Sequence, residues 1–341
     1  MSRRSQSRAA TSLEPGGGDF RSSLPPAPDG PCANVLGIAV EALNLEGALA
    51  RVARALQSGR KGYVCAVGVH GILEARRDSN VARAFADAAI VIPDGTPTVW
   101  VGRLQKHASM DHVTGPALML AIFSRDEFAR YSHFFYGGKQ GVADELAASM
   151  LRQFPWTRIA GTYTPPFRAL TSAEESDLAK TIKACKPDMI WVGISTPKQE
   201  LFMRRMLPRL ETRLMLGVGA AFDFHTGRLK DCAPWVKTAG LHWLHRFLQD
   251  PKRLWRRNLG NAAFLWHVAL QLTGLRDYPE PARLAISQDN SLFAGDPVAA
   301  PRESNSPSGV RACQHSQGGG DGSSRLAWEA AHTTGQTCLD D

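Results

Sequence analysis

The chain has 341 residues, of which 43% are hydrophobic and 21% charged, and its formal net charge is +8. This length suits one large α/β domain or two small ones, and the excess of Lys and Arg indicates an anionic partner: a nucleic acid, a phosphate-bearing substrate or an anionic membrane. The six cysteines form no CxxC pair and no short Cys/His spacing, which excludes the usual zinc patterns and fits a reduced, intracellular protein best.

Both ends of the sequence have the composition of disordered chain. Residues 1–31 are rich in Ser, Arg, Gly and Pro, and they lack the apolar run that a secretory signal requires. Residues 279–341 repeat this character. We therefore expect two disordered tails, with an α/β domain at 32–239 and a helical appendage at 240–278 between them.

Between the tails, short apolar runs alternate with segments of helical period. The apolar runs predict strands at 62–67, 90–92, 133–136, 189–192 and 213–218. The helical segments lie at 45–58, 73–86, 117–123, 141–154, 173–184 and 198–207. Ser172 with Glu175 fits a capping box before the fifth of these helices. The alternation predicts βαβ units, and so a Rossmann-like, mainly parallel sheet flanked by helices, with ligands beyond the carboxyl ends of the strands.

The first segment with candidate chemistry is Pro93-Asp94-Gly95, at the end of a predicted strand. A carboxylate at this point projects into the crevice of an α/β sheet, where Asp94 could deprotonate an attacking hydroxyl as a general base. Pro, Asp and Gly also form turns, so a plain turn is the alternative.

A glycine pair, Gly137 and Gly138, stands between a predicted strand and helix. Glycines let the backbone approach a phosphate, and the N-terminus of a helix favours anions. The spacing is looser than G-x-G-x-x-G and lacks G-K-[ST], so a structural turn is the alternative to a phosphate loop.

Two later strand ends carry polar side chains. Thr196 precedes a helix whose first turn holds Lys198, Gln199 and Glu200, and these groups could clamp a nucleobase, a ribose or a sugar. An ordinary helix start with a favourable acidic first turn is the alternative. Asp223 follows a strand within a run of small residues, where it is either a ligand or a satisfied turn carboxylate.

Basic residues accumulate near the predicted appendage. Between residues 228 and 257, eight Lys or Arg stand against two Asp, with three tryptophans interleaved. Arg can hold a diphosphate in bidentate fashion, and Arg with Trp also suits a membrane interface. The helical pattern from 240 to 272 is interrupted at Pro251 and Gly260 and is too polar to cross a bilayer, so no transmembrane segment is expected. The alternative is a solvated basic face with tryptophans in the core.

In this order the segments resemble the WecG/TagA/CpsF glycosyltransferases. The resemblance spans about residues 34–272 and rests on the strings PDG, VTGP, GG, PPF, VGISTPKQE, GVGAAFDFHTG and APWVKTAGLHWLHRFLQDPKRLWRR. It implies an inverting transferase that uses no metal and no other cofactor. Such an enzyme moves N-acetylmannosamine, its uronic acid or a glucose-type sugar from a UDP donor to a polyprenyl-diphosphate-linked acceptor, in the synthesis of exopolysaccharide or cell-surface polysaccharide.

The resemblance assigns the role of catalytic base to Asp94. With the segments above, it gives a donor-binding set of His70, Gly95, Gly137, Gly138, Thr196, Lys198, Gln199, Glu200 and Asp223. His70 stands near the place of an asparagine that many members carry. The expected acceptor and diphosphate contacts are Arg246, Arg253, Arg256 and Arg257. The implied location is the cytoplasm, at the anionic inner face of the cell membrane, with no nucleic-acid partner and with a homo-oligomer left open.

Two other classes of protein share some of these features. A nucleotide-dependent oxidoreductase of Rossmann type fits the alternating pattern, but the sequence has no complete dinucleotide fingerprint. A nucleic-acid-binding protein fits the charge alone and lacks a recognisable reading motif.

Overall fold

The computed structural model describes residues 30–229, 251–281 and 310–311. The predicted tails fall almost entirely outside these ranges, as do residues 240–250 of the predicted appendage. The domain boundaries therefore stay predictions.

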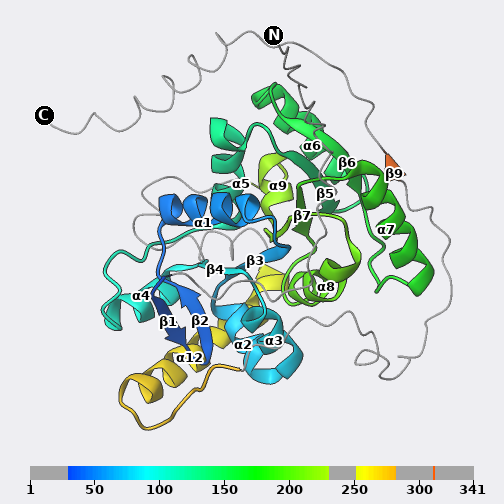
Figure 1. Ribbon diagram of the computed structural model, residues 1–341. Coiled ribbons are helices and arrows are strands. Elements are labelled where there is room, and N and C mark those ends of the chain that lie inside the picture. The colour runs from blue at the N-terminus through cyan, green and yellow to red at the C-terminus, as the bar shows by residue number, and fades with distance from the viewer. Residues whose placement is uncertain (1–29, 230–250, 282–309, 312–341) are drawn as a thin grey trace, which may run out of the picture.

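Within the described residues, a seven-stranded sheet of order β4-β3-β8-β7-β5-β6-β9 forms the centre of the molecule (Figure 1). Six strands are parallel: β3 (Gly62–Val67), β4 (Ile90–Pro93), β5 (Ser132–Gly137), β6 (Arg158–Tyr163), β7 (Met189–Gly193) and β8 (Leu214–Gly217). The short β9 (Val310–Arg311) pairs antiparallel with β6. The predicted α/β, Rossmann-like fold is confirmed.

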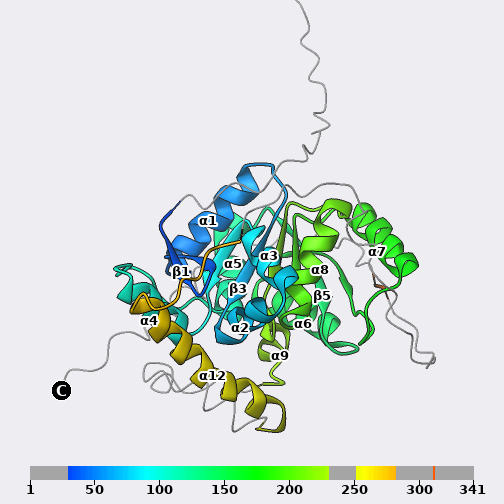
Figure 2. The ribbon, with the colours of Figure 1, turned by 90° about the horizontal axis from the view of Figure 1, so that it is seen from below.

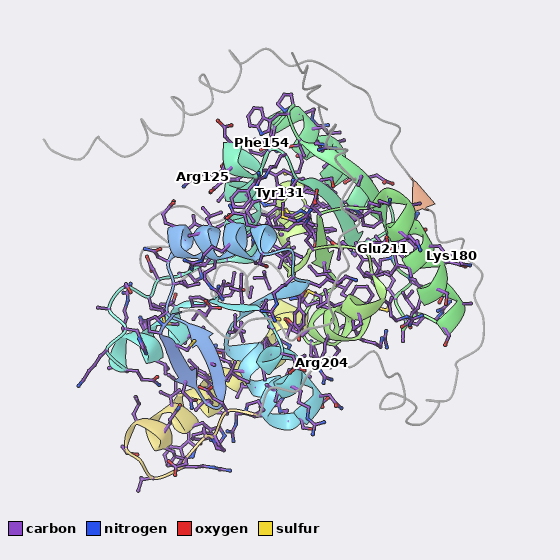
Figure 3. All side chains as sticks on the ribbon, viewed as in Figure 1. Arg125, Tyr131, Phe154, Lys180, Arg204 and Glu211 are labelled. Carbon is purple, nitrogen blue, oxygen red and sulfur yellow. The ribbon has the colours of Figure 1, made fainter. Side chains whose placement is uncertain are left out.

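Helices cover both faces of this sheet, as the two views show (Figures 1 and 2). One face packs against α2 (Val69–Arg77), α3 (Ser79–Ala86), α7 (Ser172–Cys185) and α8 (Lys198–Met206), and α12 (Pro251–Leu272) packs on α2. The other packs against α1 (Leu45–Gln57), α5 (Gly115–Ser124), α6 (Val142–Gln153) and α9 (Ala221–His225). Two short 3-10 turns, η1 (Asp126–Phe128) and η2 (Leu207–Arg209), complete these layers. Polar ties add to the apolar packing: Arg204 Nε on α8 donates to the buried Asp87 at 2.7 Å, just after α3 (Figure 3).

Several elements differ from the sequence-based expectation. The helix predicted at 73–86 is two helices, because Asp78 is extended and its side chain accepts the N–H of Asn80 at the start of α3. The capping box of α7 is formed by Thr171 and Glu174, one residue earlier than predicted. Glu175 is instead buried and pairs with arginines from α8 and η2. Because Glu175 is buried in these ion pairs, Thr171 and Glu174 form the capping box instead of Ser172 and Glu175.

Several further elements were not predicted from the sequence: β6, β9, α9, and the hairpin and neighbouring helix described next. A two-stranded hairpin, β1 (Cys32–Val35) and β2 (Ile38–Glu41), stands apart from the main sheet beside α4 (Thr96–Leu104). The side chain of Glu41 pairs with the buried Arg51 of α1 at 2.8 Å. This ion pair ties the hairpin to the helix that follows it.

The helix α12 continues through Gly260, where the sequence suggested an interruption. A Cβ atom at this position would lie 2.7 Å from Leu73 Cδ1, so glycine allows α12 to approach α2 closely. Phe264 and Val268 are buried against the main core. The described part of the predicted appendage therefore covers the core. No helix among the described residues is long and apolar enough to cross a membrane.

The C-terminal end of α12 also closes onto the hairpin through Asn34. Gln271 Nε2 donates to Asn34 O at 2.9 Å, and Asn34 Nδ2 donates to Tyr278 O at 2.9 Å. Asn34 N donates to Gln105 Oε1 at 3.0 Å, at the end of α4. One asparagine thus connects the hairpin, α4 and the segment after α12.

Candidate functional site

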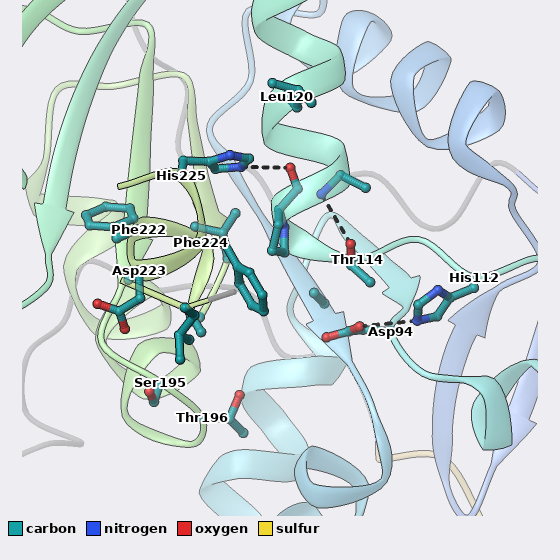
Figure 4. A pocket seen from close by; sticks show the side chains of 18 of the residues that line it. Asp94, His112, Thr114, Leu120, Ser195, Thr196, Phe222, Asp223, Phe224 and His225 are labelled. Atoms are coloured by element: carbon teal, nitrogen blue, oxygen red, sulfur yellow. Dashed lines mark hydrogen bonds and ion pairs between the residues drawn. The ribbon is translucent and has the colours of Figure 1, made fainter. Parts of the chain in front are cut away.

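A cavity of about 950 Å³ lies beyond the carboxyl ends of β3, β4, β7 and β8, where an α/β sheet is expected to bind its ligand. One side, here called the β4 wall, consists of Asp94, Thr96, Val99, Trp100, Arg103, Asp111 and His112. The opposite side, here called the β7–β8 wall, consists of Gly138, Gly193, Ser195, Thr196, Gln199, Val218, Gly219, Ala220, Phe222, Asp223, Phe224, His225 and Leu229. Residues of α5 lie between the walls (Figure 4).

The backbone around Asp94 fixes where its carboxylate points. Asp94 N donates to Val67 O at 2.9 Å, and a Cβ atom at Gly68 would lie 2.3 Å from Asp94 O. The ends of β3 and β4 are therefore tightly joined. Gly95 has φ +119°, which lets the chain turn directly into α4. The Asp94 side chain, 39% exposed, reaches the cavity as predicted, with His112 Nε2 at 3.8 Å from Oδ1 (Figure 4).

The sequence analysis named only Asp94 on the β4 wall and missed the other six residues, among them Trp100, Arg103 and Asp111. Arg103 Nε donates to Met110 O at 3.0 Å, and Nη2 donates to Asp111 Oδ1 at 3.3 Å. Trp100 lines the cavity while 55% exposed. The sequence contained a usable signal, since Trp100 and Arg103 are three residues apart directly after the PDG segment and share a face once that stretch is helical.

The β7–β8 wall is held by a buried hydrogen-bond cluster at the start of α8. Thr196 Oγ1 and Gln199 Nε2 both donate to Glu200 Oε1 at 2.9 Å, and Gly219 N donates to Gln199 Oε1 at 3.1 Å. Gln199 and Glu200 are 2% and 0% exposed. Burial raises the pKa of Glu200, while its hydrogen bonds to Gln199 and Thr196 oppose that shift.

Glu200 lies behind the cavity wall rather than on it. It is absent from the cavity lining, whereas Thr196 and Gln199 are part of it. The second oxygen, Oε2, has no hydrogen-bond partner within the described part of the chain. The structure therefore gives Glu200 a supporting place beneath the two residues that face the cavity.

The glycine pair has two different positions. Gly138 lines the cavity with φ +75°, and its N–H donates to Gly193 O at 3.1 Å. Gly137 does not line it, and a Cβ atom there would lie 2.5 Å from Gly193 O. The close approach of the β5 and β7 ends accounts for glycine at position 137.

Three other members of the predicted donor set also lie outside the cavity lining. Gly95 serves the turn described above, and Lys198 is exposed on α8. His70 lies on α2, with Nδ1 at 3.8 Å from Glu74 Oε1. The structure thus brings Asp94, Gly138, Thr196, Gln199 and Asp223 together around one cavity and leaves the other predicted donor ligands outside it.

Asp223 and His225 come from the short helix α9 on the β7–β8 wall (Figure 4). His225 Nε2 lies 3.1 Å from Pro116 O, which ties α9 to the start of α5. The Asp223 carboxylate lies on the side of the cavity opposite Asp94 (Figure 4). The site therefore has carboxylates on both walls: Asp94 and Asp111 on the β4 wall and Asp223 on the β7–β8 wall.

The predicted acceptor arginines are only partly covered by the structure. Arg246 lies outside the described residues, and Arg253, Arg256 and Arg257 belong to α12, where only the backbone of this stretch is described. In residues 30–229, 251–281 and 310–311, no group of three or more His, Cys, Asp or Glu side chains is placed to hold a metal ion.

Comparison with known proteins adds independent information. Residues 33–278 match the model of the glycosyl transferase WecG/TagA/CpsF family. An N-acetylglucosaminyldiphosphoundecaprenol N-acetyl-beta-D-mannosaminyltransferase of Bacillus spizizenii is 27% identical over 186 residues, which cover 54% of this chain and 70% of the relative. The enzyme of the same name from Bacillus subtilis is 23% identical over 208 residues, covering 61% and 79%. The match covers most of the chain, including both cavity walls and α12, and the chain is therefore a glycosyltransferase of the WecG/TagA/CpsF family.

Proposed function

We propose that the chain transfers a sugar from a UDP donor to N-acetylglucosamine linked to a polyprenyl diphosphate. N-Acetylmannosamine is the first candidate for the donor sugar, because the relatives are named for its transfer. Its uronic acid and a glucose-type sugar are the other candidates. The observation that carries the proposal is the carboxylate of Asp94, which the end of β4 directs into a cavity of about 950 Å³.

In the proposed reaction, Asp94 accepts the proton of an acceptor hydroxyl as that oxygen attacks C1 of the donor sugar. The bond between C1 and the UDP oxygen breaks on the opposite face, so the configuration at C1 inverts and UDP leaves with the electron pair. Backbone N–H groups and arginine side chains would stabilise the charge on the leaving diphosphate. The transfer needs no metal in this proposal.

The donor is assigned to the β7–β8 wall and the acceptor to the β4 wall. The support for this division is that the proposed base must touch the acceptor hydroxyl, and that Asp94 is on the β4 wall. Thr196, Gln199 and Asp223 then remain on the opposite wall for the nucleotide sugar. The fixed hydrogen bonds of Thr196 and Gln199 suit the part of the donor, such as UDP, that is the same in every reaction cycle.

The test is a donor screen with the purified full chain. A panel of UDP-sugars is offered with and without a soluble N-acetylglucosamine diphosphate carrying a short alkyl chain, and UDP release and product are measured. We expect acceptor-dependent UDP release, highest with UDP-N-acetylmannosamine and unchanged by EDTA. The proposed reaction is wrong if no UDP-sugar in the panel supports transfer, and metal independence is wrong if EDTA abolishes activity and Mn²⁺ restores it.

We further propose that the chain works at the anionic inner face of the cell membrane, with the basic start of α12 near the lipid. Each basic residue close to such a surface contributes roughly 1 kcal/mol, screened by salt. Because Phe264 and Val268 are core residues, truncation before α12 would damage the fold, and charge reversal at Arg253 and Arg256 is the better test. We expect the wild type, but not the double variant, to float with anionic vesicles at low salt. Equal flotation of both proteins would contradict a role for these arginines.

A further inference from the structure

The β4 wall presents an exposed aromatic side chain to the cavity. Trp100 is 55% exposed, although tryptophan is a mostly buried residue type. The neighbouring Val99 and Val101 are only 3% and 2% exposed and hold α4 in place. Trp100 is therefore not needed to pack α4, and an exposed aromatic surface in a concave site commonly marks a ligand contact.

Asp94, Trp100 and Arg103 follow one another along this wall. Asp94 stands two residues before α4, Trp100 lies in its second turn, and Arg103 is three residues further on the same face. The helical rise places Trp100 and Arg103 about 4.5 Å apart along the axis. A ligand lying along α4 would meet a carboxylate, an indole ring and a guanidinium in that order.

The guanidinium of Arg103 pairs with the Asp111 carboxylate, and part of its hydrogen-bonding capacity is unused. Its Nε and Nη2 are occupied by Met110 O and Asp111 Oδ1. Its Nη1 has no partner in the described part of the chain. A guanidinium with a free edge can donate to a phosphate oxygen.

We propose that the indole of Trp100 binds the sugar ring of the diphosphate-linked acceptor, with the reacting hydroxyl toward Asp94 and the diphosphate toward Arg103. A pyranose ring has an apolar C–H face and polar edges. The wall offers the complement, namely an aromatic face between the Asp94 carboxylate and the Arg103 guanidinium, which also pairs with Asp111. This inference rests on the proposed function, because it assigns the acceptor to the β4 wall.

The experiment measures acceptor KM, donor KM and kcat for the wild type, Trp100→Ala and Trp100→Phe. The acceptor is the soluble N-acetylglucosamine diphosphate with a short alkyl chain, in the absence of vesicles. Phe167→Ala is the matched control, since Phe167 is an 85% exposed aromatic side chain outside the cavity lining. We expect Trp100→Ala to raise the acceptor KM about tenfold, with donor KM unchanged, while Trp100→Phe recovers most of the loss.

A second arm tests the orientation of the acceptor. Arg103→Gln should raise the KM of the sugar diphosphate more than that of the corresponding sugar monophosphate. Equal effects on the two acceptors would contradict the place of the diphosphate. Circular dichroism of each variant verifies that the fold is intact, as expected for exposed side chains.

Three outcomes would overturn the inference. An unchanged acceptor KM in Trp100→Ala would show that Trp100 does not bind the acceptor sugar. A raised donor KM would show that it contacts the nucleotide sugar instead. If the acceptor KM changes only when the assay is repeated with a long-chain acceptor in vesicles, Trp100 contacts lipid and not the sugar. In all three cases the wild type still transfers sugar, so the proposed function stands; if the wild type transfers to no diphosphate acceptor, both fall together.

Discussion

The two walls of the cavity are built in different ways. On the β7–β8 wall, the polar groups at the start of α8 are fixed by one another and by the buried Glu200. On the β4 wall, Asp94, Trp100 and Arg103 have side chains about 40–55% exposed. A preorganised wall suits an invariant nucleotide, whereas an open wall suits an acceptor that arrives attached to a lipid. Within one site, the buried and hydrogen-bonded side chains are thus on one wall and the solvent-exposed side chains are on the other.

Replacing Asp94 should have the largest effect and gives the strongest test of the contrast. Asp94→Asn removes a general base while keeping its shape, so kcat should fall by about 10²–10⁴-fold, with UDP-donor binding unchanged by calorimetry. Asp223→Asn, on the opposite wall, is the matched control and should affect donor KM more than kcat. The assignment of the walls is reversed if Asp223→Asn loses turnover and Asp94→Asn does not.

The buried cluster predicts the next largest effect. Glu200→Leu leaves Thr196 and Gln199 without their shared acceptor, at a cost of about 1–3 kcal/mol for an unsatisfied buried group. Donor KM should rise between about 5- and 150-fold, with little change in acceptor KM. Glu200→Gln keeps a carbonyl oxygen at the same place and should remain near wild type. If Glu200→Leu lowers thermal stability and weakens the binding of donor and acceptor equally, Glu200 only supports the core.

The raised pKa of Glu200 predicts a smaller, pH-dependent effect on stability. A carboxyl group whose pKa is higher in the folded state contributes stability below its unfolded pKa and loses it as pH rises through the folded value. Chemical unfolding of the wild type and of Glu200→Gln across pH 4–8 isolates this group. The wild type should lose free energy of unfolding relative to the variant as pH rises, by about 1.4 kcal/mol for each unit of pKa shift. A pH-independent difference would mean that Glu200 has the same pKa folded and unfolded.

The smallest effect is expected at Lys198. It lies beside the buried cluster but is exposed and outside the cavity lining. Lys198→Ala should therefore change kcat and both KM values by no more than about twofold. A tenfold rise in donor KM would show that the β7–β8 wall extends further along α8 than the cavity indicates.

Continuous apolar runs made most of the sheet predictable. Strands such as β3 and β7 are buried almost throughout and read as unbroken hydrophobic segments. Strand β6 was missed because Arg158 and Gly161 interrupt its pattern. The hairpin was missed because Asn34 and Glu41 interrupt its two four-residue strands, which therefore form no continuous apolar run.

Site residues that directly follow a strand could be predicted from the sequence. Site residues whose place depends on how a helix packs could not. Asp94, Thr196 and Gln199 follow strands, so topology alone carries them to the cavity. Trp100 depends on the direction of a helix that was not predicted. The sequence also could not separate Glu200 from its cavity-facing neighbours, because burial decides which side of α8 meets the ligand.

The closure at Asn34 has a consequence for how the chain is made. Asn34 bonds to Tyr278, 244 residues later, and to Gln271, 237 residues later. During synthesis from the N-terminus, the hairpin emerges first but cannot complete these bonds until nearly the whole domain has left the ribosome. Contacts between such distant segments are slow to form, because a long loop must close before they contribute. The first strands of the chain are thus among the last to be finished, and the hairpin remains incomplete until the rest of the domain is present.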